Sequence, residues 1–274
     1  MTSTLNQGTQ QKPPNSSRRK WVGLAVAGLI AALLAAGLIY FFGGAEPAEV
    51  DLDSTINAVS ETTATNATSD SSAVTSATSN SDSGTSGVTD ATGTWSVDTT
   101  TGTLNFEQAT ATFAGFRVEE ELVQIGAATA VGRTPDVSGT VTIDGTTITT
   151  AEIEVDLTTI VSNESRRDDN IQGALNTNQN PTATFVITEP LDFGEVPTEG
   201  VTVSAVATGD LTINGVTNPV KIPLQARVVG DAILVVGSAE VLFSDYDVET
   251  PSAQVVLSVA DLGVIELQLW LVRA

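Results

Sequence analysis

Three patterns of hydrophobic and polar positions follow one another along the chain. Residues 21–42 form an apolar run without a charge, and residues 43–93 show no apolar periodicity. From Trp95 onward, hydrophobic and polar residues alternate with a period of two, which is typical of β-strands. We therefore predict an N-terminal tail over 1–20, a membrane-spanning helix over 21–42, a disordered linker over 43–93 and a folded β domain over 94–274.

The apolar run is long enough to cross a bilayer. A helix of this length spans about 33 Å, against roughly 30 Å of hydrocarbon. Arg18, Arg19 and Lys20 precede the run directly, and the next basic residue is Arg117. Because cytoplasmic flanks carry the excess of Lys and Arg, we predict a single-pass signal anchor in the cell membrane, with the N-terminus cytoplasmic and the β domain extracytoplasmic. A cleaved signal peptide is the alternative, and it exports the same part of the chain.

The linker over 43–93 is rich in Ser and Thr and carries acidic but no basic residues. A stretch of this kind buries too little apolar surface to offset the entropy lost on ordering, so we expect it to be disordered. Asn66-Ala67-Thr68 is a glycosylation sequon. A glycosylated stalk and an unmodified spacer both remain open.

Alternating segments separated by turn residues predict the β domain. Ile153, Val155 and Leu157 alternate with acidic residues, as in a strand with one buried face. Hairpin turns are predicted at Asp144-Gly145, Asn214-Gly215 and Gly230-Asp231. Residues 162–175 are the one predicted helix. About eight antiparallel strands of this kind close into a barrel or pair into a sandwich, because both arrangements hide sheet edges.

Composition excludes several classes of function. The chain has 11 Lys and Arg against 33 Asp and Glu, a net charge of −22, which repels nucleic acid. It has no Cys and no His, so thiolate chemistry and the commonest general base and metal ligand are excluded. We therefore expect no enzyme, no catalytic residue and no metal, and a hydrolase that relies on carboxylates is the remaining enzymatic alternative. Asp245, Asp247 and Glu249 alternate, but they lack the spacing of a calcium loop and are expected to form a solvated acidic strand end.

An ordered series of short motifs runs through the β domain. The motifs are Trp95-Ser96-Val97-Asp98, Phe113-Ala114-Gly115-Phe116, Val137-Ser138-Gly139-Thr140, Glu154-Val155-Asp156-Leu157, Pro181-Thr182-Ala183-Thr184-Phe185 and the segment from Gly209 to Val220. This series resembles the YceI-like family of exported lipid-binding domains over nearly all of residues 94–274. The resemblance implies an all-β fold, an extended, lipocalin-like, eight-stranded antiparallel barrel with one short helix, whose interior holds a long isoprenoid chain. Asn170 and Asn214 stand where the family often has His, so a headgroup contact that depends on His is not implied here.

An eight-stranded barrel is either filled by its own side chains or just wide enough to hold one small ligand. The resemblance favours the ligand. Burial of a prenyl tail contributes about 0.8 kcal/mol per CH₂ before ordering costs, so the tail alone can supply the affinity. The residues predicted to line an apolar cavity are Phe106, Phe113, Phe116, Val141, Ile143, Val155, Leu157, Phe185 and Leu211.

Headgroup contacts have a separate set of candidates, which are Arg117, Arg166, Arg167, Asn170 and Asn214. Because Asp168 and Asp169 follow Arg166 and Arg167 directly, an internal salt bridge or a helix cap is the favoured interpretation of these arginines. A neutral headgroup, such as that of an isoprenoid quinone, fits the acidic domain better than a diphosphate does.

These patterns together predict a membrane-tethered lipid-binding protein. It would hold an isoprenoid chain, a quinone or a polyprenyl lipid, for transport, storage or protection, with no cofactor apart from this ligand. The alternative is a cell-surface structural or interaction domain with a filled core and no ligand. Homodimerisation is left open. A hollow interior would support the first hypothesis and a solid interior the second.

Overall fold

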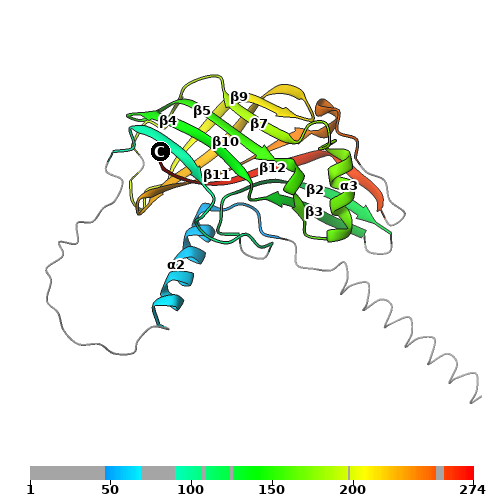
Figure 1. Ribbon diagram of the computed structural model, residues 1–274, viewed down its shortest axis with the longest axis horizontal. Coiled ribbons are helices and arrows are strands. Elements are labelled where there is room, and N and C mark those ends of the chain that lie inside the picture. Colours follow the sequence, from blue (N-terminus) through cyan, green and yellow to red (C-terminus); the bar gives the residue numbers. More distant parts are fainter. Residues whose placement is uncertain (1–46, 69–89, 107–108, 124–125, 197, 251–255) are drawn as a thin grey trace, which may run out of the picture. The chain divides into compact units, whose positions relative to one another are not determined.

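The computed structural model describes residues 47–68, 90–106, 109–123, 126–196, 198–250 and 256–274 (Figure 1). The chain divides into two compact units, Met1–Gly44 and Ala45–Ala274, and every described residue belongs to the second. The predicted tail and membrane-spanning helix over 1–42 lie outside the described residues. No helix in the described part combines the length and the hydropathy needed to cross a membrane.

Eight antiparallel strands form a closed ring (Figure 1). In ring order they are β1 (Gly93–Asp98), β4 (Val137–Asp144), β5 (Thr147–Asp156), β7 (Thr182–Ile187), β9 (Val203–Ile213), β10 (Val216–Val229), β11 (Ala232–Leu242) and β12 (Val256–Arg273). β1 closes the ring, because it pairs with β4 on one side and with the end of β12 on the other. The all-β, eight-stranded antiparallel barrel is confirmed, and the sandwich is excluded.

A group of further strands extends the wall at one end of the barrel. β2 (Phe113–Leu122) pairs with the first part of β12 and with β3 (Gly126–Thr134), and β3 pairs with the short β6 (Val161–Ser162). β12 is therefore shared, with β2 along its length up to Gln268 and β1 from Trp270 onward. The short β8 (Leu191–Asp192) pairs with β5.

The hairpin turns lie where the turn residues predicted them. Asn214 and Gly215 join β9 to β10 with φ values of 51° and 76°. Two consecutive positive φ angles define the type I′ turn, whose twist matches that of the strands it joins. Gly145 and Gly230 also have positive φ at their turns. These local signals are confirmed.

The predicted helix over 162–175 is shorter than expected. Ser162 ends β6, the 3₁₀ turn η2 spans Ser165–Arg167, and the helix α3 spans only Asp168–Ala174. The Asp168 carboxylate accepts hydrogen bonds from the backbone N–H and the hydroxyl of Ser162, both at 2.8 Å. These two bonds tie the start of α3 to the edge of the barrel wall. Two further 3₁₀ turns are η1 (Leu157–Thr159) and η3 (Phe243–Tyr246).

A helix also occupies part of the segment predicted to be disordered. α2 spans Leu52–Thr68, so the prediction of disorder is wrong for these residues. Asp51 caps this helix, because its carboxylate accepts a hydrogen bond from the backbone N–H of Ser54 at 2.7 Å. Composition suggested disorder because few residues here are apolar, yet one buried face is enough to hold a short helix against a larger body.

The buried face of α2 packs on the outside of the barrel. Leu52 is only 2% exposed and contacts Leu234, Val236 and Trp270, whose side chains point outward from β11 and β12. The Thr55 hydroxyl donates to the side-chain oxygen of buried Gln268 at 2.7 Å. The folded domain therefore begins near Pro47 and not at Thr94.

The residues just before α2 cover a buried group of charges on the same outer wall. The Glu266 carboxylate binds the Arg117 guanidinium at 2.5 Å and the Arg133 guanidinium at 3.3 Å. Arg117 also donates to the backbone carbonyl of Pro47, and Arg133 donates to that of Ala48 at 2.7 Å. Burial of ionised groups is costly unless their hydrogen bonds are satisfied, and the two carbonyls supply acceptors that one carboxylate does not.

The barrel interior is solid at the end that β1 closes. Trp95 is fully buried there, and its ring nitrogen donates to the Ala91 carbonyl at 2.8 Å. Side chains from all round the ring belong to the same buried cluster, among them Val141, Ile143, Val203, Val228, Ile233 and Leu271. The space left for a ligand therefore lies at the other end, where β2 has replaced β1 beside β12.

We predict that Leu52→Ala destabilises the domain by about 2–3 kcal/mol, because it removes the buried anchor of α2. The measurement is urea unfolding of the full-length chain, followed by tryptophan fluorescence. Asn57→Ala is the matched control, since Asn57 is exposed on the same helix. Equal stability of the two variants would show that α2 does not contribute to the fold.

Candidate functional site

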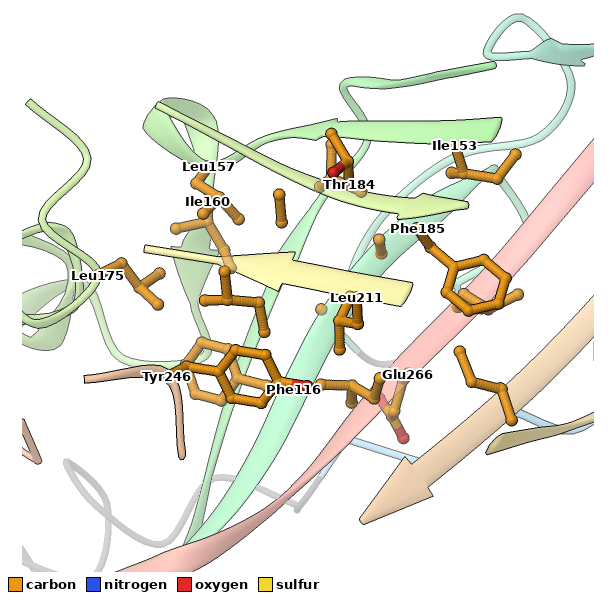
Figure 2. A pocket seen from close by; sticks show the side chains of 18 of the residues that line it. Phe116, Ile153, Leu157, Ile160, Leu175, Thr184, Phe185, Leu211, Tyr246 and Glu266 are labelled. Carbon is orange, nitrogen blue, oxygen red and sulfur yellow. The ribbon is translucent and has the colours of Figure 1, made fainter. Parts of the chain in front are cut away.

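An apolar cavity occupies the hollow half of the barrel (Figure 2). Its volume, taken as the space open to the centre of a water molecule, is about 130 Å³, whereas a single water needs only about 10–15 Å³. We call it the main cavity. Its wall comes from η1, β2, β5, β7, β9, β10 and β12, with the turn η3 at one side. The polar residues among its described lining are Thr184, Tyr246 and Glu266, and the Glu266 carboxylate points to the outer wall, where it binds Arg117 and Arg133.

A second cavity of about 100 Å³ adjoins the first. Both are lined by Phe116, Leu175, Phe243 and Val248. The rings of Phe116 and Phe243 meet edge to face, with centroids 6.4 Å apart and an angle of 87° between their planes. The two cavities therefore meet at this aromatic pair, and together they form an elongated space suited to a chain-shaped ligand.

Glycines on neighbouring strands set the positions of the cavity aromatics. A Cβ atom on Gly132 would lie 2.5 Å from the ring of Phe116, and one on Gly209 would lie 2.5 Å from the ring of Phe185. A Cβ atom on Gly263 would likewise lie 2.2 Å from the ring of Phe243. Each ring therefore lies against bare backbone. A larger residue at any of these glycines would push an aromatic ring into the cavity.

The second cavity has a polar end. Glu120 and Arg167 line it together with Asn170, and the Arg167 guanidinium binds the Glu120 carboxylate. Arg167 also donates to the side-chain oxygen of Asn163 at 3.0 Å. Burial raises the pKa of Glu120, and the charge of Arg167 offsets part of that rise. The expected internal salt bridge of Arg167 is confirmed, with Glu120 and not an adjacent aspartate as its partner.

Five of the nine predicted cavity residues line the main cavity, namely Phe116, Val155, Leu157, Phe185 and Leu211. Four do not, and their placement was wrong. Val141 and Ile143 belong to the solid half of the core. Phe106 is half-buried in the connection between β1 and β2 and lines neither cavity.

Phe113 lies on the outer face of the wall. The Arg133 guanidinium carbon is 4.5 Å from the centre of its ring. Phe113 and Phe116 are three residues apart on β2, and side chains at odd separations point to opposite faces of a strand. The two phenylalanines could therefore not both line the interior.

The structure places the headgroup candidates in different parts of the domain. Arg167 and Asn170 line the second cavity. Arg117 is held by Glu266 and the carbonyl of Pro47 and lines neither cavity. Asn214 has a structural role at the β9–β10 turn, since its side chain donates to the Tyr246 and Asp247 carbonyls at 3.3 and 3.0 Å. The prediction for the Arg166 side chain lies outside what the structure describes.

The segment around Tyr246 was misinterpreted in the sequence. Asp245 belongs to η3, and Asp247 follows it with a left-handed φ of 52°, so the acidic residues do not alternate on one strand. The same turn supplies Phe243 and Tyr246 to the main cavity. No period-two signal marks either residue as inward-facing, because a 3₁₀ turn interrupts the alternation. Among the described residues, no group of three or more acidic, His or Cys side chains could hold a metal ion.

We predict that Arg167→Ala raises the pKa of Glu120 further, because the buried carboxylate loses the charge that offsets its desolvation. A ¹³C NMR titration of glutamate-labelled protein measures it. A group whose native pKa is raised loses stabilising effect as pH rises through that pKa, so the stability deficit of the variant should be greatest at neutral pH and shrink in acid. Arg227→Ala, which breaks a contact with exposed Asp53, is the control. An unchanged Glu120 titration would contradict this account.

Comparisons with known proteins agree with this architecture. The model of the family described as YceI-like domain matches residues 95–271. A UPF0312 protein of Pseudomonas aeruginosa is 33% identical over 117 residues, which cover 41% of this chain and 56% of that protein. Protein YceI of Shigella flexneri is 30% identical over 140 residues, 46% of this chain and 68% of that protein. The chain thus spans about half the length of the first of these relatives.

Among solved structures, the chain is similar to a polyisoprenoid binding domain from Saccharophagus degradans, with a TM-score of 0.49, 16% identity and coverage of 66% of this chain and 98% of that one. It is also similar to BcnA of Burkholderia cenocepacia, with a TM-score of 0.44, 20% identity and coverage of 57% of this chain and 95% of that one. The family model, which spans the whole ring of strands from β1 to β12, decides the assignment. The chain belongs to the YceI-like domain family.

Proposed function

We propose that this protein is a membrane-tethered, extracytoplasmic lipid-binding protein that holds an isoprenoid chain in its barrel for transport, storage or protection. The observation that carries the proposal is the pair of adjoining apolar cavities inside the barrel. Membership of the YceI-like family supports it, because the resemblance implies an isoprenoid ligand.

The chemistry of the wall favours a hydrocarbon chain. Aliphatic and aromatic side chains make up most of the lining of the main cavity. Each buried CH₂ group of a ligand contributes about 0.8 kcal/mol before the costs of ordering and association. A folded prenyl chain of a few units therefore gains enough to bind without a charged anchor.

The charges near the cavities argue for a neutral headgroup. Arg117 and Arg133 are held by Glu266, and Arg167 is held by Glu120. Binding of a diphosphate through these three described arginines would require at least one of the pairs to break. A neutral ligand, such as an isoprenoid quinone, leaves every pair intact. The alternative of a structural domain with a filled core fits only the solid half of the barrel.

The proposed membrane tether is supported by the sequence alone. The apolar run over 21–42, with its basic flank, is the predicted anchor. α2 then lies between the anchor and the barrel and packs on the outer wall, so part of the predicted linker belongs to the domain. Such an arrangement would keep the barrel near lipids dissolved in the bilayer.

We predict that Ala183→Phe lowers the affinity for prenyl lipids at least tenfold, because Ala183 is buried in the wall of the main cavity and a phenyl ring there occupies the space of the ligand. The measurement is organic extraction of the purified full-length protein followed by mass spectrometry, with a titration of added lipid. Val186→Phe is the matched control, because Val186 is 40% exposed on the same strand. Equal lipid content in both variants would contradict the cavity as binding site, and a dominant prenyl diphosphate in the extract would overturn the neutral headgroup.

A further inference from the structure

The hydroxyl of Tyr246 is buried without a hydrogen-bond partner. Tyr246 is 2% exposed and lines the main cavity together with Phe116 and Leu211 (Figure 2). Among the described residues, nothing accepts a hydrogen bond from its hydroxyl or donates one to it. Its backbone carbonyl accepts from Asn214 at the β9–β10 turn, so the backbone belongs to the rim and the ring reaches inward. The hydroxyl is thus a polar atom placed in an apolar enclosure.

An unpaired buried hydroxyl is unfavourable for folding, since it loses its hydrogen bonds to water and gains none in the protein. A phenylalanine would fill the same place without that cost. The other polar side chains of the wall are no substitute. The Glu266 carboxylate already binds two arginines, and no bond joins Thr184 to Tyr246.

A trapped water would be a poor partner here. Buried waters typically make about three hydrogen bonds, and the lining around Tyr246 is almost entirely apolar. An oxygen atom on a bound lipid meets the requirement better, because its hydrocarbon part is stabilised by the rest of the cavity.

At neutral pH the hydroxyl keeps its proton and can donate it to an acceptor on a ligand. Burial raises the pKa of Tyr246, and the negative charge of neighbouring Asp245 adds to the rise, so the phenol keeps its proton. No Lys or Arg is among the described residues that line the main cavity. An anionic acceptor would therefore meet no neutralising charge at this point, whereas an uncharged oxygen needs none.

We propose that Tyr246 donates a hydrogen bond to an uncharged oxygen of the bound lipid, a carbonyl or an ether, which lies inside the main cavity. The ligand is then a prenyl chain with a neutral acceptor and not a pure hydrocarbon. This inference rests on the proposed function, because it assumes that a lipid enters the cavity.

Two probes of equal shape test the inference. One is farnesylacetone, a prenyl methyl ketone, and the other is the same chain with a methylidene group in place of the ketone oxygen. Native mass spectrometry of the full-length protein gives both dissociation constants. The wild-type protein should prefer the ketone by about 3- to 10-fold, which corresponds to one buried neutral hydrogen bond.

Tyr246→Phe keeps the ring and removes the donor. It should abolish the preference for the ketone while leaving the affinity for the methylidene probe unchanged. The variant should also unfold at the same or a higher temperature, since no hydrogen bond is lost. Thr184→Val is the matched control, because Thr184 lies between inward-facing Ala183 and Phe185 and its hydroxyl points away from the cavity, so the variant should keep the preference.

A spectroscopic readout locates the bond. The chain has two tyrosines, Tyr40 and Tyr246, so ¹³Cζ-labelled tyrosine gives two NMR signals, and the one missing in Tyr246→Phe belongs to the cavity. That signal should shift with the ketone more than with the methylidene probe.

The outcomes separate the two proposals. If both probes bind the wild-type protein equally, or if Thr184→Val removes the preference and Tyr246→Phe does not, the role of Tyr246 is overturned and lipid binding stands. If farnesyl phosphate binds more tightly than the ketone, the requirement for an uncharged oxygen is wrong. If neither prenyl probe binds and Ala183→Phe changes nothing, the proposed function itself fails.

Discussion

The sharing of β12 between two partner strands is the constraint on which the rest of this structure depends. β1 pairs with its last residues and closes the ring, and there the interior is filled by side chains around Trp95. Farther back along β12, the partner is β2, which leads on to β3 and β6 and not to β4. A ring of eight strands is narrow enough to be filled. Where the ring gives way to a wider wall, the side chains no longer meet across the interior, and two cavities remain.

The outer surface of that wider wall needs its own stabilisation. The Glu266 carboxylate binds two arginines there. The segment from Pro47 to α2 supplies backbone carbonyls that accept hydrogen bonds from these arginines, and apolar side chains that pack on the wall. Buried ion pairs tolerate little change, because removal of one partner leaves an uncompensated charge. The wall that borders the main cavity is therefore held from outside by residues that precede the barrel in the chain. A stretch that looks like a spacer in the sequence therefore supports the wall of the main cavity.

The lining of the two cavities combines aromatic rings packed on glycine backbone with polar groups at two defined places. The aromatic rings of Phe116, Phe185 and Phe243 lie against glycine backbone, which leaves them room without a loss of wall contacts. One end of the space carries the Glu120–Arg167 pair, and the wall of the main cavity carries the hydroxyl of Tyr246. An elongated amphipathic molecule matches this distribution, with its chain along the apolar surface and a polar atom at a defined point.

Local features of this protein were determined by its sequence. Asn214-Gly215 forms its turn because these residues tolerate two positive φ angles, and the strands on either side alternate because one face of each is buried. The motif series from Trp95 to Val220 was sufficient to identify the family, which the family model confirms. Even the opposite directions of Phe113 and Phe116 follow from their spacing on one strand.

Other features were decided only when distant segments came together. The helix α2 exists on a surface made by β11 and β12, and Glu266 is buried because two arginines from β2 and β3 meet it. Tyr246 reaches the cavity from a 3₁₀ turn whose acidic neighbours suggested a solvated strand. Whether the barrel interior is filled or open at a given level depends on whether β1 or β2 pairs with β12 there. Strand pairing of this kind is a long-range contact, and alternation within a single strand carries no information about it.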